Sequence, residues 1–147
     1  MTPYEVKTVD TALKILSRRL CTGTVFDSPT AVKDFLCLKL GSLEHEVFAI
    51  MFLTVQHSLI AFEEMFRGTV AQTSVYPREV VKRALHYNAG AVLLSHNHPS
   101  GVCEPSRADE HLTMTIKQAL ALVDVRVLDH IVVSNHQATS FAERGLL

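Results

Sequence analysis

Short runs of apolar residues predict the strands of a sheet. Val47–Val55 is almost continuously apolar, and Ala89–Leu94 is a second such run that ends in polar residues. Runs this short and aliphatic are typical of strands buried on both faces. We expect Ala91–Ser95 to be the strand of the second run. The remaining predicted strands are Leu59–Phe66 (returning antiparallel beside the first run), a short extended piece at Val70–Val75, Val125–Val133 and Ala138–Phe141.

Apolar residues at helical spacing mark three helices before and between these strands. Ser28 followed by Pro29 is a good N-cap and first-turn pair, and the apolar repeat behind it stops at Gly41. Pro77–Asn88 is the second helix, and the third follows Pro105-Ser106. Strands and helices alternate in the second half of the chain, which predicts an α/β layer fold, a mixed sheet with helices on both sides.

The first 26 residues carry a weaker pattern. Asp10 is a candidate N-cap for a short helix that has leucines along one side, with Gly23 after its end. We expect residues 1–26 to form an N-terminal helical extension and residues 27–147 to form the main domain.

Composition and charge narrow the class of protein. The 147 residues are 48% hydrophobic and 20% charged, with a net charge of −1, so the whole chain carries no basic footprint for nucleic acid or anionic membrane. The N-terminus has no apolar signal region, and no apolar run is long enough to span a bilayer. The three cysteines match no metal or redox spacing, which is typical of free thiols. We expect a soluble cytoplasmic protein with no membrane partner.

The strongest chemical signal follows the second apolar run. His96 and His98 are two residues apart at a strand end, so both imidazoles would point to one face, and Asp109 comes eleven residues after His98. Two imidazoles and one carboxylate leave a coordination position open for water, as a catalytic zinc ion needs. Ser106 and Asp109 also fit a helix capping box, Ser-x-x-Asp, and the two interpretations are compatible.

The predicted strand Leu59–Phe66 contains two candidate acid/base residues. Glu63 and Glu64 stand between apolar neighbours, and a buried carboxylate needs a compensating partner. One of them would act as general base for water, or one simply faces solvent at a sheet edge. Consecutive strand residues point to opposite faces, so only one can reach the site, and strand spacing alone does not choose between them.

The constellation of a glutamate, His-x-His, seven residues, Ser, two residues and Asp resembles the JAMM (MPN-plus) motif of zinc metallopeptidases, several of which cut isopeptide bonds to ubiquitin. More closely, the stretch FRGTVAQTSVYPREVVKRALHYNAGAVLLSHNHPSGVCEPSRAD and the later VLDHIVV resemble bacterial RadC-like proteins, a branch of the same superfamily. The similarity covers roughly residues 30–147.

This resemblance implies a fold and a set of roles. The fold is an α/β, three-layer α/β/α sandwich with a mixed sheet, cytidine-deaminase-like, and it would occupy residues 27–147. The resemblance implies His96, His98 and Asp109 as zinc (Zn²⁺) ligands. It places Ser106 where it supports a tetrahedral intermediate, and it matches Glu64, rather than Glu63, to the acid/base glutamate.

The implied activity is hydrolysis of a peptide or isopeptide bond by a metal-activated water, with a protein or peptide as partner. Longer RadC-like proteins carry a helix–hairpin–helix segment of a DNA-binding type, and its glycine-hairpin signature is missing here, which leaves a nucleic-acid partner weakly supported. The alternatives are a metal-dependent nuclease or DNA-repair-associated protein, and a non-catalytic scaffold. A nucleobase deaminase would need a Pro-Cys-x-x-Cys motif, which the chain lacks.

For two further residues, a structural role is preferred over metal binding. His130 is either an additional ligand or, in preference, a hydrogen-bonded core histidine of the strand Val125–Val133. Cys103, in the loop after His98, is either a metal contact or, in preference, a loop thiol.

Overall fold

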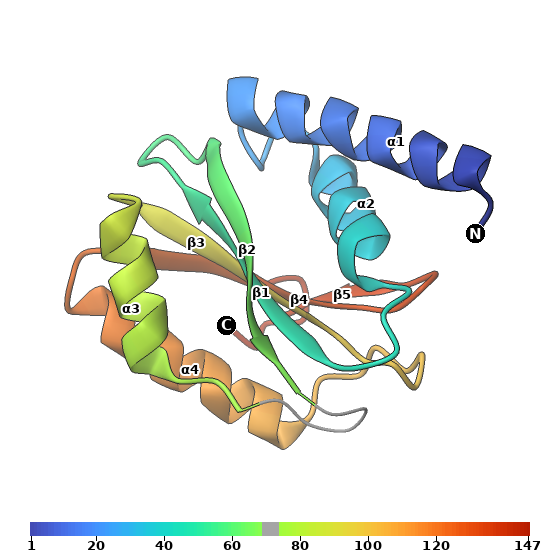
Figure 1. Ribbon diagram of the computed structural model, residues 1–147. Helices are drawn as coiled ribbons and strands as arrows, with labels where there is room; N and C mark the ends of the chain where they lie inside the picture. The colour runs from blue at the N-terminus through green and yellow to red at the C-terminus, as the bar shows by residue number, and fades with distance from the viewer. Residues whose placement is uncertain (69–73) are drawn as a thin grey trace.

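The computed structural model describes residues 1–68 and 74–147 and contains helices and strands in alternating groups. Most of the predicted extended piece Val70–Val75 lies outside the described residues. The elements, in chain order, are α1 (Pro3–Thr22), α2 (Pro29–Leu40), β1 (Val47–Leu53), β2 (Leu59–Arg67), α3 (Pro77–His86), β3 (Ala91–Asn97), α4 (Arg107–Ala121), β4 (Arg126–Val133) and β5 (Ala138–Ser140) (Figure 1).

The strands form one mixed sheet in the order β2-β1-β3-β4-β5. β1 pairs antiparallel with both β2 and β3, whereas β3 and β4 run parallel through the crossover helix α4. β5 returns antiparallel on the far edge. Every residue of β1 and of β3 is buried, as expected for central strands of a sheet that is covered on both faces.

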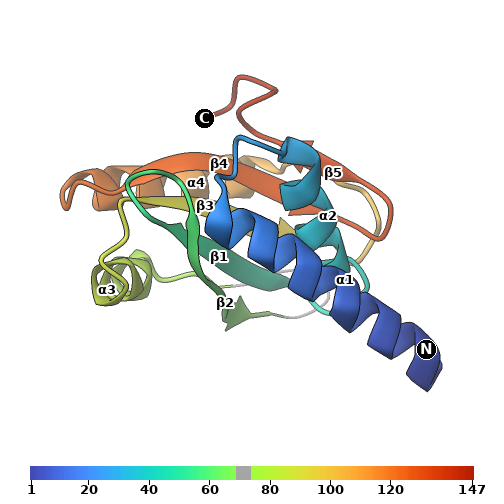
Figure 2. The ribbon, with the colours of Figure 1, turned by 90° about the horizontal axis from the view of Figure 1, so that it is seen from above.

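The sheet has one apolar core on each face. Alternate β1 residues such as Ala49 and Met51 pack with α1 and α2, while Phe48, Ile50 and Phe52 pack with α3 and α4. Figures 1 and 2 show the two helix pairs on opposite sides of the sheet. The predicted three-layer α/β/α sandwich is therefore confirmed.

The helix boundaries follow their capping residues. Ser28, Pro77 and Ser106 mark the helix starts that the sequence predicts. The prediction of an Asp10 cap is wrong, because α1 begins seven residues earlier at Pro3. There the side chain of Thr2 accepts a hydrogen bond from the Glu5 amide and the Glu5 carboxylate accepts one from the Thr2 amide, a complete capping box.

The Ser28 cap offers a test of this local stabilisation. The Ser28 hydroxyl oxygen accepts a hydrogen bond from the Ala31 amide at 3.3 Å, at the start of a helix whose inner face is buried. We expect Ser28→Ala to lower the free energy of unfolding by about 1 kcal/mol, measured by urea denaturation. An unchanged midpoint would show that water replaces the cap without cost.

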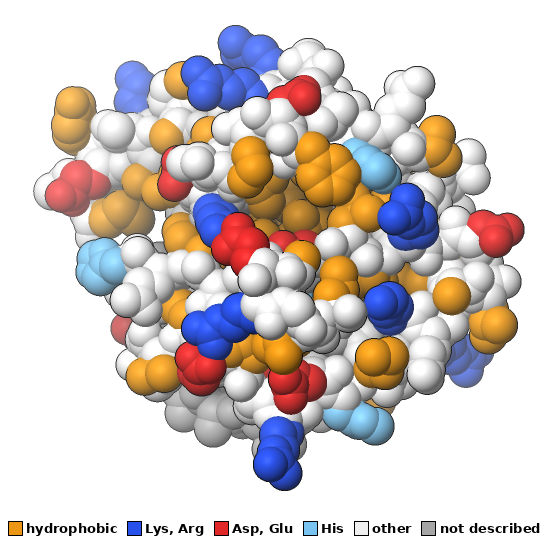
Figure 3. Space-filling model, turned by 180° about the vertical axis from the view of Figure 1, so that it is seen from behind, with side chains coloured by type: hydrophobic (Ala, Val, Ile, Leu, Met, Phe, Trp, Pro, Cys, Tyr) orange, Lys and Arg blue, Asp and Glu red, His pale blue; other side chains and the backbone are white. Residues whose placement is uncertain are grey.

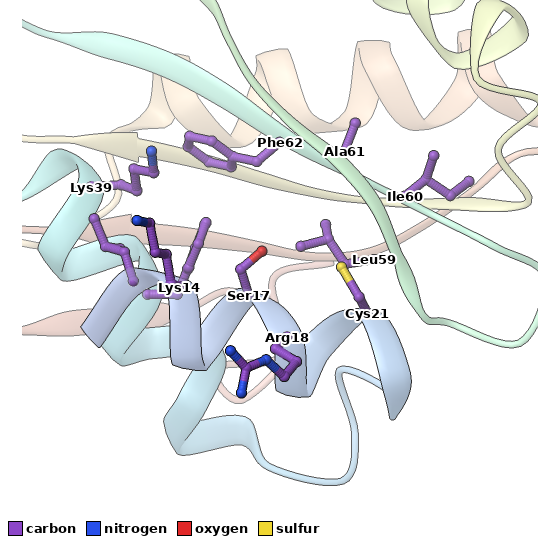
Figure 4. Close-up of a pocket in the computed structure, with 11 residues that line it drawn as sticks. Lys14, Ser17, Arg18, Cys21, Lys39, Leu59, Ile60, Ala61 and Phe62 are labelled. Carbon is purple, nitrogen blue, oxygen red and sulfur yellow. The ribbon is translucent and has the colours of Figure 1, made fainter. Parts of the chain in front are cut away.

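Helix α1 covers the α2 side of the sheet only partly. A groove of about 490 Å³ remains between α1 and the edge strand β2, with an apolar floor that includes Phe62 and a rim that carries Lys14 and Arg18 (Figure 4). Because Phe62 belongs to the core beneath α1 and α2, this groove is on the opposite face of the sheet from His96. It is therefore separate from the His-x-His motif.

The surface carries charges of both signs. On the face seen in Figure 3, basic and acidic side chains are scattered singly or in small groups among apolar and neutral ones. No helix in the described part of the chain is long and apolar enough to cross a bilayer.

Candidate metal centre at the end of strand β3

The two motif histidines extend from the end of β3. The strand continues through Asn97, two residues beyond the predicted end, and the His98 amide still donates to the Val133 carbonyl of β4 at 3.0 Å. His96 pairs with Phe48 of β1, so its ring lies on the α3/α4 face, where it is 2% exposed. The ladder thus fixes the backbone of both histidines on a buried, rigid scaffold.

Asp109 reaches the histidines from the first turn of α4. Its Oδ1 atom lies 3.3 Å from His96 Nε2, and its Oδ2 atom lies 3.3 Å from His98 Nε2. Asp109 is also the third residue of a capping box, because Oδ2 accepts from the Ser106 amide at 2.9 Å and the Asp109 amide donates to Ser106 Oγ at 3.0 Å. The helix cap therefore orients the same carboxylate that faces the histidines.

The three side chains converge on one point. His96 Nε2 and His98 Nε2 are 2.9 Å apart, and one potential ligand atom from each of the three residues lies within 4.8 Å of the others. Among the described residues this is the one group of three or more His, Cys, Asp or Glu side chains close enough to hold a metal ion. Two imidazole nitrogens and a carboxylate oxygen are a donor set that suits zinc and leaves a position open.

The electrostatics of the cluster suit a cation. Burial raises the pKa of Asp109, but the neighbouring imidazoles of His96 and His98 and a hydrogen bond from the Ser106 amide outweigh it and hold that pKa well below its ordinary range. The hydrogen bond to Asp109 raises the pKa of His98. A carboxylate that stays charged can bind a divalent ion together with the two imidazoles, and the ion then takes the place of any proton on their Nε2 atoms.

Each imidazole has its other nitrogen engaged. His98 Nδ1 lies 2.8 Å from the Val102 carbonyl, and His96 Nδ1 lies 2.7 Å from His130 Nε2. His130 is fully buried, and this desolvation lowers its pKa well below the ordinary value, so it is neutral at pH 7. His130 is thus a hydrogen-bonded core histidine, the role that the sequence favoured over an additional ligand.

The structure does not bring Glu64 to this centre. Glu64 is exposed and pairs across the β2–β1 ladder with Ala49, which belongs to the core beneath α1 and α2. Directly paired residues share a face of the sheet, so Glu64 lies on the opposite face from His96. The alternation along β2 and one irregular position near Ala49 set this orientation, and the family resemblance did not reveal it.

Glu63 is on the face of His96 but is held elsewhere. Its Oε2 atom accepts hydrogen bonds from Nε and a terminal nitrogen of Arg83 at 2.9 and 2.8 Å. Partial burial raises the pKa of Glu63, yet hydrogen bonds from Tyr87 and Arg83 leave it lower than usual. Glu63 therefore anchors β2 to α3, which answers the question of why a carboxylate stands in this strand.

The carboxylate that lies beside the histidines is Glu46, which the sequence analysis passed over. Glu46 immediately precedes β1 and interacts electrostatically with His96, His98 and Asp109. Burial raises the pKa of this half-buried carboxyl, the two histidines lower it, and Asp109 raises it, with a net rise. The missed signal is an acidic residue at the start of a strand that runs antiparallel to β3.

Asn97 fixes the backbone on both sides of Glu46. Its side chain points to the opposite face from His96 and is 1% exposed. Asn97 Oδ1 accepts from the Val47 amide at 2.8 Å, and Nδ2 donates to the His45 carbonyl at 3.0 Å and more weakly to the Leu43 carbonyl at 3.4 Å. The middle residue of His-x-His therefore holds the segment that carries Glu46.

A hollow lies next to His98. It has a volume of about 220 Å³ and is lined by His98, by Pro99 and Gly101 of the loop after β3, by Gly41 and by residues 134–137 of the β4–β5 turn. Cys103 is buried nearby, but its thiol donates to the Gln137 carbonyl at 3.4 Å, as expected of a loop thiol. The side chains of His98 and Asp109 are 16% and 14% exposed, so a ligand can reach them from solvent.

Comparison with known proteins places these residues in a family. The profile of the family described as RadC-like JAB domain matches residues 26–146. A UPF0758 protein of Methylibium petroleiphilum is 66% identical over 139 residues, and one of Leptothrix cholodnii is 63% identical over 139 residues. In both cases the match spans 95% of this chain and 63% of the relative, so the chain spans about 63% of the length of these relatives. The chain belongs to the RadC-like JAB-domain family.

Proposed function

We propose that this chain is a zinc-dependent hydrolase that cuts a peptide or isopeptide bond. The observation that carries the proposal is the convergence of His96, His98 and Asp109, with Glu46 beside them. The family supports a hydrolase, and the names of the relatives state no activity. Substrate and reaction are therefore our proposals.

The chemistry of the donor set favours zinc. Two imidazoles with engaged Nδ1 atoms would offer Nε2 to the metal, and the Asp109 carboxylate would supply the third ligand. Bound there, zinc would supply a Lewis acid that lowers the pKa of water and polarises a carbonyl group.

Glu46 replaces Glu64 as our candidate acid/base residue. A carboxyl whose pKa is raised by burial is well suited to take a proton from water and to return it to a leaving amine. The Val47 amide and the His45 carbonyl are bonded to Asn97, and the Glu46 carbonyl accepts from the Gly68 amide just after β2, so the backbone of Glu46 is held in place before substrate binds.

Ser106 would act at the oxyanion. Its Oγ atom accepts from the Asp109 amide, so the hydroxyl keeps its own hydrogen for donation. A donor placed at the negative charge that develops on a carbonyl oxygen stabilises the transition state. A protein or peptide main chain in the hollow beside His98 would bring a carbonyl group toward these residues.

The test is a screen of the zinc-loaded protein against a peptide library and against isopeptide-linked peptides, with new termini identified by mass spectrometry. We expect cleavage that a zinc chelator stops. DNA and RNA oligonucleotides are included in the screen, and cleavage of these alone would overturn the peptidase proposal in favour of a nuclease. Stable zinc binding without cleavage of any substrate would leave a non-catalytic scaffold.

A further inference from the structure

A chain of hydrogen bonds runs from Asp109 back to His96 through the core. Thr113 lies one turn after Asp109 on α4, is 2% exposed, and its hydroxyl donates to the Asp109 carbonyl at 2.7 Å. Thr113 Oγ1 also lies 2.6 Å from His130 Nδ1, and His130 Nε2 lies 2.7 Å from His96 Nδ1. The chain therefore begins and ends on two of the candidate metal ligands.

The number of hydrogens determines the direction of each bond. A threonine hydroxyl has one hydrogen, and the Asp109 carbonyl can only accept, so the Thr113 oxygen must accept from His130 Nδ1–H. The ring of His130 is fully buried, and its two nitrogens contact Thr113 and His96 and no carboxylate, so it is a neutral imidazole with one N–H. Because that hydrogen is on Nδ1, His130 Nε2 must be an acceptor. The only hydrogen that it can accept in this contact comes from His96 Nδ1.

We infer that Thr113 and His130 are positioning residues that hold His96 in the tautomer protonated on Nδ1, with Nε2 left to bind a metal. The identity of the protonated nitrogen in a histidine ligand is set by the hydrogen bond of the other nitrogen. The opposite direction of this chain would put the hydrogen on His96 Nε2, where it would block the position that faces His98 and Asp109.

Because this hydrogen-bond chain is buried, it can fix the tautomer of His96. His130 is fully buried between Phe48 and the stacked ring of Phe141, and its backbone amide is held by Asp129. No water is needed to complete the chain, since each polar atom in it has a protein partner. His98 lacks such a chain: its Nδ1 faces the Val102 carbonyl directly, which can only accept.

The experiment uses three variants of helix α4. Thr113→Val keeps the shape of the side chain and removes the hydroxyl, whereas Thr113→Ser keeps the hydroxyl. Thr115→Val is the matched control. The Thr115 hydroxyl donates to the backbone carbonyl four residues earlier, that of His111, at 3.0 Å, but among the described residues no imidazole ring is hydrogen-bonded to it. Zinc affinity is measured by competition with a chromophoric chelator, and folding by circular dichroism.

We expect Thr113→Val to bind zinc about 10- to 100-fold more weakly than the wild type, and the other two variants to bind as the wild type does. Wild-type affinity in a folded Thr113→Val variant would overturn the inference. Equal weakening in Thr113→Val and Thr113→Ser would also overturn it, because the hydroxyl would then not be the cause.

A second measurement needs neither a variant nor bound metal. Long-range ¹H–¹⁵N correlation spectra of the metal-free wild type at alkaline pH report which imidazole nitrogen carries the hydrogen. We expect both His96 and His130 to be protonated on Nδ1, and protonation of His96 on Nε2 would overturn the inference. The inference rests on the proposed metal site and not on hydrolysis, so a protein that shows this tautomer without cleaving peptides would contradict only the proposed function.

Discussion

Replacing Glu46 by glutamine is expected to abolish hydrolysis while zinc stays bound. Loss of a general acid/base carboxylate lowers kcat by a factor of about 10² to 10⁴. The amide keeps the size of the side chain and removes the group that takes and returns the proton. The measurement is turnover of the best substrate from the peptide screen, with zinc content determined on the same sample.

Glu64→Gln is the control for this prediction. Glu64 lies on the α1/α2 face of the sheet, away from His96, so we expect wild-type turnover. If Glu64→Gln is inactive and Glu46→Gln is active, the assignment from the ladder register is wrong. Loss of zinc from Glu46→Gln would make Glu46 a ligand instead of an acid/base residue.

Replacing Asn97 by alanine is expected to affect both stability and activity. The substitution leaves the buried Val47 amide and the His45 carbonyl without their partner. Two unsatisfied groups cost together about 3 kcal/mol of unfolding free energy, measurable by urea denaturation. Turnover should fall as well, because the backbone on both sides of Glu46 loses its anchor, while zinc content stays near that of the wild type.

Asn135→Ala serves as the stability control, since Asn135 is an exposed residue of the β4–β5 turn. We expect a change within about 0.5 kcal/mol for this variant. Wild-type stability of Asn97→Ala would mean that the segment before β1 is held by other contacts. Wild-type turnover in a destabilised Asn97→Ala variant would separate this anchor from the position of Glu46.

The sequence predicts much of this fold because its signals are local. The uninterrupted apolar run of β1 indicates a central strand, and the Ser28-Pro29 pair marks the start of α2. The predicted start of α1 was wrong because Asp10 is acceptable as a cap by residue type, while the stronger signal, Thr2 followed by Pro3 and Glu5, begins eight residues earlier. The division at residues 26 and 27 stays a proposal, since α1 packs against α2 and β2.

In the candidate site, too, the residues that are close in sequence could be predicted and the distant ones could not. His96, His98 and Asp109 lie within fourteen residues of one another in the sequence, so their spacing already indicates a site. Glu46 is fifty residues from His96, and only the antiparallel register of β1 against β3 brings it to the histidines. Thr113 and His130 were not recognised as a pair for the same reason: a helix and a strand that are distant in sequence meet in the core.

The measurement that tests the metal centre most directly is the zinc content of the purified protein by mass spectrometry. His96→Ala and Asp109→Ala are measured beside it, with His111→Ala, an exposed histidine of α4, as the control. We predict about one zinc per chain in the wild type and in His111→Ala, and loss of zinc from the other two. No stoichiometric zinc in the wild type after zinc is added, or zinc retained without His96 and Asp109, would contradict the account.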